Sequence, residues 1–255
     1  MTDGDRPRLL DLCCCQGGAS CGYQQAGFYV VGVDIDEQPR HAGDEFIKAD
    51  ALEVLRDDAF LDTFDAIHYS PPCQRWAPLN ALPSTKGADE HPDLITPGRP
   101  LLDGWSRRTG RPWVMENVMA APLDRRHSIV LCGEMFGLRT IRHRRFEPSP
   151  GLSLTAPRHP VSGEVVAGVV CDRQGHRRPT ATKRRRERWA EGWHVSVTGD
   201  VGTYMGPAGM GIDWMTGNGL SEAIPPVYTR FIGGQLRRFL GLGPAAELVG
   251  VGGSR

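Results

Sequence analysis

Residues 8–18, RLLDLCCCQGG, decide the fold, because an apolar run ends here in a pair of glycines. Arg8–Cys14 predicts a buried strand, and Gly17-Gly18 predicts a tight turn into a helix near Ala19–Ala26. A strand, a glycine turn and a helix in this order are typical of a parallel α/β sheet. Ligands of such sheets bind at the carboxyl ends of the strands, so Asp11 and the turn after it lie where a site is expected.

The rest of the first half repeats this alternation of apolar runs with turn and helix signals. Pro92–Arg108 has weak helical spacing. The further predicted strands are Phe28–Val33, Phe46–Lys48, Phe64–Tyr69, Pro112–Val118, Ser128–Cys132 and Arg142–Phe146, of which the last two would complete the sheet. We therefore expect an α/β fold built on one sheet.

The composition changes from about Glu147 to Met210, where prolines, glycines and polar residues dominate. The densest basic stretch of the chain, Arg177–Arg188, lies here. This change indicates a small, irregular second unit inserted into the first. After it, Ser221–Leu240 has apolar residues at helical spacing and Pro225-Pro226 near its start, which predicts a helix that packs back on the sheet.

The overall composition is that of an ordinary globular protein, with 255 residues, 40% hydrophobic and 24% charged. No apolar run approaches the ~20 residues needed to cross a bilayer. The polar residues 1–8 do not resemble a secretory signal. These features exclude membrane and exported proteins, and we expect a cytoplasmic protein.

The net charge is zero, but the charges are unevenly distributed along the chain. Residues 1–65 hold 14 acids and 5 bases, whereas residues 99–190 hold 19 bases and 8 acids. This asymmetry favours one face that meets a polyanion. Arginine outnumbers lysine 27 to 3, which suits forked contacts to phosphate and guanine and is equally typical of a GC-rich genome.

The seven cysteines lie at positions 13, 14, 15, 21, 73, 132 and 171, with no Cys-x-x-Cys pair. Adjacent cysteines do not easily converge on one tetrahedral metal ion, so no metal site is expected. Without an export signal we expect reduced thiols, most of them structural. One of them is then available for chemistry.

Two acids and a glycine turn form a candidate cofactor site. Asp11 precedes Gly17-Gly18, and Asp34 follows the second predicted strand, where its carboxylate can hold a ribose. Because Gly-x-Gly-x-x-Gly is absent, a cofactor with a ribose but no phosphate fits best. The alternative is a tight turn with no ligand.

Ser70-Pro71-Pro72-Cys73-Gln74 ends another predicted strand and fixes the path of the chain where Cys73 emerges. A cysteine at this edge, close to Arg75, is a candidate thiolate nucleophile. The alternative is a buried structural thiol, the usual fate of a free cysteine.

A carboxylate and two guanidinium groups follow at the ends of later strands. Glu116 ends an apolar run, as either a desolvated acid with a raised pKa or a surface cap. Arg142 and Arg144 alternate along a predicted strand, so they should share one face, which is either functional or simply solvated.

The order of these motifs resembles that of the DNA cytosine-5 methyltransferases. Asp-Leu with Gly-Gly, then Asp34, Asp50, Pro-Pro-Cys-Gln, Glu-Asn-Val and Arg-x-Arg-x-Phe follow one another in the same sequence. The resemblance spans Leu10–Leu240 apart from the insert. It implies a Rossmann-like S-adenosylmethionine-dependent methyltransferase sheet with a small irregular target-recognition insert. The implied division is residues 1–147 and 211–245 for the catalytic domain, 148–210 for target recognition and 246–255 for a flexible tail.

The resemblance also implies S-adenosylmethionine as the cofactor, with Asp34 on the ribose hydroxyls and Asp50 near the adenine amine. The cofactor-binding residues it implies are Asp11, Leu12, Cys13, Gly17, Gly18, Asp34, Ile35, Asp50, Ala51, Pro72, Glu222 and Ala223.

The implied substrate is a cytosine flipped out of double-stranded DNA. Cys73 would attack C6, Glu116 would hydrogen-bond N3 and N4, and Arg144, with Arg142 beside it, would steady the base and the developing charge. The implied DNA-binding residues are Arg75, Arg177, Arg178, Lys183, Arg184, Arg185, Arg186 and Arg188. No obligate protein partner is expected.

Three positions depart from the family pattern. Cys13 replaces an aromatic residue, Cys15 replaces a glycine, and Glu222 stands where an asparagine is expected. These departures keep three alternatives open: an RNA substrate, a modified S-adenosylmethionine, and a catalytically weak DNA-binding or decoy protein.

Overall fold

A computed structural model describes residues 6–77, 91–160, 169–170, 189–190, 194–195, 197 and 205–244. In this part of the chain, seven strands form one sheet in the order β3-β2-β1-β4-β5-β7-β6. The strands are β1 (Arg8–Leu12), β2 (Tyr29–Asp34), β3 (Glu45–Lys48), β4 (Ala66–Tyr69), β5 (Trp113–Asn117), β6 (Ile129–Leu131) and β7 (Arg144–Pro148). Strands β1 to β5 run parallel, whereas β7 is antiparallel to both β5 and β6. A separate parallel pair joins β8 (Val169–Val170) to β9 (His194–Val195).

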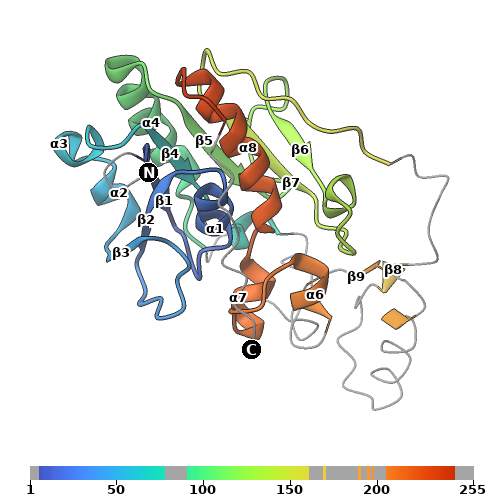
Figure 1. Cartoon of the computed structure of the whole chain (residues 1–255). Coiled ribbons are helices and arrows are strands. Elements are labelled where there is room, and N and C mark those ends of the chain that lie inside the picture. Colours follow the sequence, from blue (N-terminus) through green and yellow to red (C-terminus); the bar gives the residue numbers. More distant parts are fainter. Residues whose placement is uncertain are drawn as a thin grey trace.

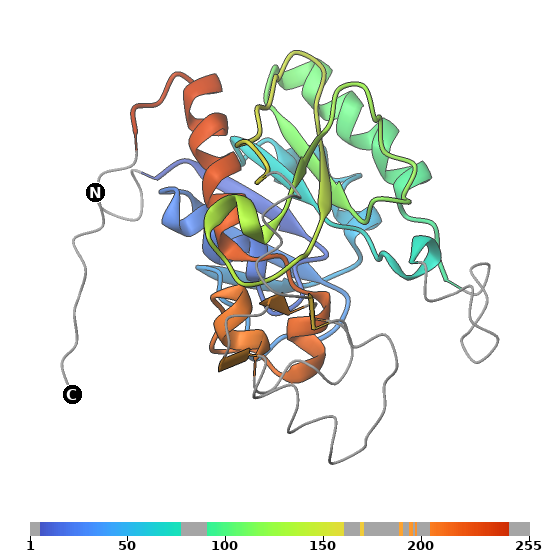
Figure 2. The same cartoon turned by 90° about the vertical axis from the view of Figure 1, so that its right-hand side faces the viewer.

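Helices cover both faces of the sheet (Figures 1 and 2). The longer ones are α1 (Gly18–Gln25), α4 (Ile95–Thr109) and α8 (Pro226–Phe239). The shorter ones are α2 (Ala51–Val54), α3 (Asp58–Leu61), α6 (Gly206–Met210), α7 (Gly217–Glu222) and the 3₁₀ turns η2 (Gln74–Trp76) and η5 (Gly133–Phe136). No helix in the described ranges is long and apolar enough to cross a membrane.

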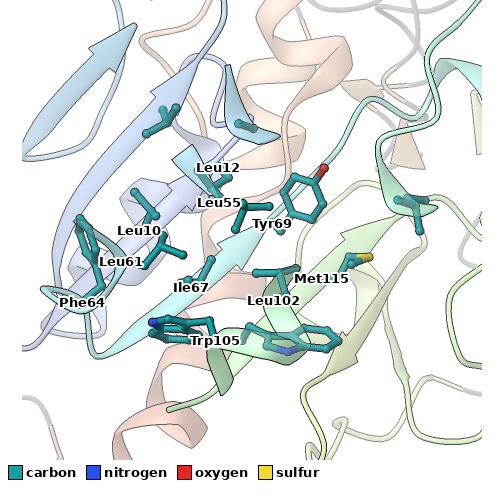
Figure 3. Close-up of a cluster of buried hydrophobic side chains, with 14 of the residues drawn as sticks. Leu10, Leu12, Leu55, Leu61, Phe64, Ile67, Tyr69, Leu102, Trp105 and Met115 are labelled. Atoms are coloured by element: carbon teal, nitrogen blue, oxygen red, sulfur yellow. The ribbon is translucent and has the colours of Figure 1, made fainter. Parts of the chain in front are cut away.

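Strand alternation sorts the side chains of the central strands between two cores. Leu10, Ile67 and Met115 point toward α2, α3 and α4, and pack there with Leu102 and Trp105 (Figure 3). The core on the opposite face is formed with α1 and α8 and includes Tyr23, Phe28, Tyr228 and Ile232. Asp11, His68 and Glu116 each follow one residue of the first set along the same strand. Their polar side chains therefore point toward the face that α1 and α8 cover.

Close packing of α1 against α8 places the start of α8 beside the first glycine turn. A Cβ atom at Gly22 would lie 2.0 Å from the Pro226 carbonyl oxygen, and one at Gly18 would lie 2.5 Å from that of Ile224. The Thr229 hydroxyl donates to the Ala19 carbonyl at 2.9 Å. Glycine is required here because two backbones approach too closely for any side chain.

The expected α/β sheet is confirmed, and every predicted strand is present with shifted ends. The first strand stops at Leu12 rather than Cys14, because Cys13 and Cys15 adopt left-handed backbone angles, φ 59° and 47°. The strand expected over Arg142–Phe146 begins only at Arg144 in the structure. The expectation that Arg142 and Arg144 lie on one strand is therefore wrong.

The expectation of a single helix over Ser221–Leu240 is also wrong. This segment holds the end of α7 and the whole of α8, and between them Ala223 and Pro225 have extended conformations (ψ 153° and 129°). A residue before proline is pushed out of the helical region, and Ile224 and Pro225 both precede one. The short helices α2 and α3 were not expected, although Asp50 and Asp57 cap their first turns.

Candidate active site

A pocket of about 280 Å³ lies at the carboxyl ends of β1, β2, β4 and β5. Cys73, Glu116 and Arg144 line one part of it. The predicted cofactor-binding residues that also line it are Asp11, Cys13, Gly18, Asp34, Ile35, Asp50, Ala51, Pro72, Glu222 and Ala223. Leu12 is fully buried in the core instead, and Gly17 forms the turn behind the pocket at φ 79°. The structure thus brings together the two predicted groups, nucleophile and cofactor residues.

The loop after β1 reaches the pocket through its backbone. The Cys15 amide donates to Asp34 Oδ2 at 2.9 Å, and the Cys14 amide donates to the Val33 carbonyl at 3.0 Å. These bonds hold Cys13 and Cys15 in the left-handed region, which costs an L-residue on the order of 1 kcal/mol. Cys15 therefore has the backbone conformation of the glycine that the family pattern expects, at the cost of strain.

Replacing Cys15 by glycine should raise the free energy of unfolding by about 1 kcal/mol, because glycine adopts this conformation without strain. Urea denaturation measures the change. The matched control is Cys21→Gly inside α1, which should lower stability by about 1 kcal/mol. A loss of stability in Cys15→Gly would show that thiol packing outweighs backbone strain.

Backbone amides fix the carboxylates of two acids that line the pocket, Asp34 and Asp50. Asp34 Oδ1 accepts from the Asp36 amide at 3.0 Å, in addition to the Cys15 bond on Oδ2. Asp50 caps α2 through Oδ1 alone, accepting from Leu52 and Glu53 at 2.7 and 3.1 Å. Beside them Ile35 is 63% exposed and lines the pocket, so it offers an apolar surface to a flat ring.

Two further acids are partly or wholly desolvated. Asp11 is fully buried, accepts a hydrogen bond from the Ser20 hydroxyl, and has its pKa raised to about 7 by burial. Its Oδ1 is buried without a hydrogen-bond partner among the described residues. Burial, and then the charge of Asp34, raises the pKa of Glu222, whose Oε2 lies 3.9 Å from Cys15 Sγ. A positively charged ligand in the pocket would favour the ionised forms of Asp11 and Glu222 and so lower their pKa.

Cys73, Glu116 and Arg144 form the predicted reactive part of the pocket. Arg144 Nε lies 3.1 Å from Glu116 Oε1, and Glu116 is only 5% exposed. Burial raises the pKa of Glu116, and Arg144 opposes that shift. Burial also raises the pKa of the Cys73 thiol, with Arg144 lowering it and Glu116 raising it. The free protein therefore keeps a protonated thiol close to an acid with increased proton affinity.

A buried hydrogen-bond chain supports Glu116 from behind. Tyr23 OH lies 3.0 Å from His68 Nδ1, His68 Nε2 lies 2.6 Å from Ser70 Oγ, and Ser70 hydrogen-bonds the Glu116 carboxyl group. Burial lowers the pKa of His68 to about 3, so its ring is neutral. Sequence reasoning did not identify His68 or Ser70 as functional; the sequence signal was a polar residue, His68, inside an apolar strand.

Gln16 is a third residue that sequence reasoning missed, although it lies in the turn quoted first. Its side-chain amide accepts from the Thr216 amide at 2.9 Å and donates to the Thr216 hydroxyl at 3.0 Å. Its backbone carbonyl accepts from the Trp214 indole at 2.9 Å. These bonds attach the loop after β1 to the start of α7, which brings Glu222 to the pocket.

Two other predicted residues, Arg142 and Arg75, are described by the structure and do not line the pocket. Arg142 is buried and donates to the carbonyls of Val197 at 2.9 Å and Ser221 at 2.7 Å, so it connects backbone segments. Arg75 donates to the His91 carbonyl at 3.1 Å and lies over the Trp76 ring. The other predicted DNA-binding residues, Arg177, Arg178, Lys183, Arg184, Arg185, Arg186 and Arg188, lie outside the described residues.

Comparison with known proteins finds structural but no sequence relatives. No family model and no curated protein matches the sequence. A prophage-encoded candidate DNA modification methyltransferase of E. coli matches with 14% identity and a TM-score of 0.58, over 92% of this chain and 99% of that one. S. pombe Dnmt2 methyltransferase matches with 15% identity and a TM-score of 0.54, over 93% and 100%. Entamoeba histolytica methyltransferase EhMeth matches with 11% identity and a TM-score of 0.56, over 92% and 99%. The chain therefore has the α/β fold of these methyltransferases along nearly its whole length, as the resemblance of its motifs implies.

Proposed function

We propose that this protein is a DNA (cytosine-5)-methyltransferase that uses S-adenosylmethionine. The observation that carries the proposal is the meeting of a thiol, a carboxyl group and a guanidinium group in the pocket that Asp34 and Asp50 also line. The fold shared with the prophage-encoded protein and Dnmt2 supports methyl transfer. The thiol distinguishes addition to a pyrimidine ring from direct methylation of an amine.

The pocket suits S-adenosylmethionine, which when bound supplies a methyl group on a positively charged sulfur to the activated C5 carbon. Asp34 has its carboxylate fixed by two amides for ribose hydroxyls, and Asp50 retains Oδ2 for the adenine amine. The orphaned oxygen of Asp11 and the desolvated Glu222 favour a cation in the pocket. Ile35 contributes an apolar surface for adenine. Cys13 offers a smaller surface than the aromatic residue that the family pattern has at its position.

The chemistry of the three reactive groups follows from their environments. Cys73 releases its proton to solvent and its sulfur forms a bond to C6, while the protonated Glu116 donates its proton to N3 so that the ring accepts the electrons. Arg144 holds Glu116 and steadies the charge that develops on the base. After C5 has been methylated, a water molecule takes the C5 proton and the C6–sulfur bond breaks to release the Cys73 thiolate. N3 then returns its proton to Glu116, which restores the starting state. Arg142 acts as a positioning residue behind this site.

Double-stranded DNA is the proposed substrate, with the cytosine flipped into the pocket because C5 and C6 are unreachable inside the stack. The basic middle of the chain supports a polyanionic partner through phosphate contacts. Transfer of radiolabelled methyl groups to duplex DNA and to RNA, compared at equal nucleotide concentration, tests this choice. Label in DNA supports the proposal, whereas label in RNA alone would show that RNA, not DNA, is the substrate.

Replacing Asp34 by asparagine should weaken S-adenosylmethionine binding roughly 10- to 100-fold, because a charge-assisted hydrogen bond to ribose contributes about 1.5–3 kcal/mol. Calorimetry measures the dissociation constant. The matched control is Asp57→Asn, an exposed carboxylate that caps α3 and does not line the pocket. Equal affinity in wild type and Asp34→Asn would remove Asp34 from the cofactor site.

A further inference from the structure

A second cluster of reactive side chains lies outside the pocket. Cys132, His143 and His159 each place one potential metal-ligating atom within 4.8 Å of the other two. Cys132 follows β6 directly and is fully buried, and His143 immediately precedes β7. His159 lies on the segment that leaves β7 toward the insert. Three chain segments therefore converge at one edge of the sheet with thiol and imidazole groups.

A carboxylate completes the cluster. Glu134 Oε2 lies 3.9 Å from Cys132 Sγ and 3.8 Å from His159 Nε2. Its other oxygen, Oε1, lies 3.8 Å from Nε2 of His194 in β9. The rings of His143 and His159 stack with centroids 5.4 Å apart and planes 8° from parallel. One sulfur and two imidazoles thus lie within 4.8 Å of one another, and the carboxylate lies within 3.9 Å of the sulfur and of one of the two rings.

The orientation of His159 is fixed in the manner of a metal ligand. Its Nδ1 lies 2.8 Å from the Pro160 carbonyl oxygen, to which it donates. The proton is then on Nδ1, and Nε2 carries a lone pair. Nε2 is buried without a hydrogen-bond partner among the described residues. Metal-binding histidines almost always donate their other ring N–H to a carbonyl or a carboxylate in this way.

We propose that Cys132, Glu134, His143 and His159 bind one Zn²⁺ ion. A donor set of thiolate, imidazole and carboxylate suits this borderline-soft ion, which prefers four tetrahedral ligands at about 2.0–2.3 Å. Such ligands stand roughly 3.3–3.8 Å apart, so on binding the three atoms that lie within 4.8 Å would draw together, and one of the stacked rings would turn until both imidazole lone pairs point at the ion. Cys132 would release its proton to solvent on binding. His194 would hold the second oxygen of Glu134 as an outer partner.

This site would be structural, because four protein ligands leave no open position for a substrate. It joins the edge strands β6 and β7 to His159, on the segment leading to residues 161–204. Through Glu134 it also reaches β9 by way of His194. The ion would therefore fix the base of the insert beside Arg144. The absence of Cys-x-x-Cys does not exclude such a site, since its ligands come from separate segments.

Metal analysis of the purified full chain, expressed with ample zinc, tests the proposal. Wild type should contain about one zinc per chain, and Cys132→Ser and His159→Ala should each lose most of it, on the order of tenfold. The control Cys21→Ser, in α1 and outside the cluster, should keep its zinc. Wild type without zinc, or equal zinc in Cys132→Ser, would overturn the proposal.

Two measurements on wild type apply even if these variants do not fold. Cobalt added to the chelator-treated protein should give the sulfur-to-cobalt charge-transfer and tetrahedral absorption bands of a thiolate site. Zinc should protect one thiol from alkylation, and peptide mass spectrometry should identify it as Cys132. No cobalt bands, or protection of a different cysteine, would contradict the site. These outcomes do not depend on methyltransferase activity.

Discussion

Replacing Cys73 by alanine is expected to reduce methyl transfer to DNA on the order of 10⁴-fold or more, to background. The sulfur forms the bond to C6 that makes C5 nucleophilic, and no other described thiol in the reactive part of the pocket lies beside Glu116 and Arg144. Cys13, Cys14 and Cys15 also line the pocket, but burial raises their pKa far above that of an ordinary thiol. They cannot replace the nucleophile.

The Cys73→Ala experiment has two controls that separate chemistry from folding. Cys21→Ala changes a thiol that does not line the pocket and should retain wild-type activity. DNA that contains 5-fluorocytosine should trap a covalent adduct with wild type and not with Cys73→Ala, because fluorine at C5 blocks the last proton loss. Full activity in Cys73→Ala would exclude the covalent mechanism.

The second large effect is expected from Glu116→Gln, which should reduce the rate roughly 10²- to 10⁴-fold, the usual contribution of a general acid. Glutamine keeps the shape of the side chain but cannot transfer a proton to N3. Loss of the buried carboxylate also removes the ionic partner of Arg144, 3.1 Å away. Single-turnover methyl transfer with saturating DNA measures the effect on the chemical step.

The pH dependence provides an independent check on Glu116. Burial raises the pKa of this carboxyl group, so its protonated form persists to higher pH than in an ordinary glutamate and is lost as the pH rises through that pKa. The contribution of Glu116 to the rate should disappear in that direction, and Glu116→Gln should lack this dependence. Glu53→Gln, on the exposed face of α2, is the control and should behave like wild type. An unchanged rate in Glu116→Gln would remove the acid from the mechanism.

Much of the fold and of the pocket could be predicted because the residues concerned lie at strand ends. In a parallel sheet these ends share one edge, so Asp11, Asp34, Cys73 and Glu116 meet although they are far apart in sequence. The apolar runs before them identify the strands without knowledge of their neighbours. The order of the motifs then pointed to a methyltransferase fold, which the structural relatives confirm.

What could not be predicted depends on the path of irregular segments. Alternating bases suggested that Arg142 and Arg144 share a strand face, but the strand begins only at Arg144 and Arg142 binds the carbonyls of Val197 and Ser221. The cluster of Cys132, His143 and His159 has no regular spacing, since it forms where turns between edge strands return to one place. No local pattern encodes such a meeting.

Mass spectrometry of nucleosides from the DNA of cells that express the chain tests the central claim most directly. We predict 5-methyldeoxycytidine in cells with the wild-type protein and none above background with Cys73→Ala. Bisulfite sequencing of the same DNA would then locate the methylated sites. A folded, S-adenosylmethionine-binding protein that leaves this DNA unmodified, or that methylates the exocyclic amine of cytosine, would contradict the account.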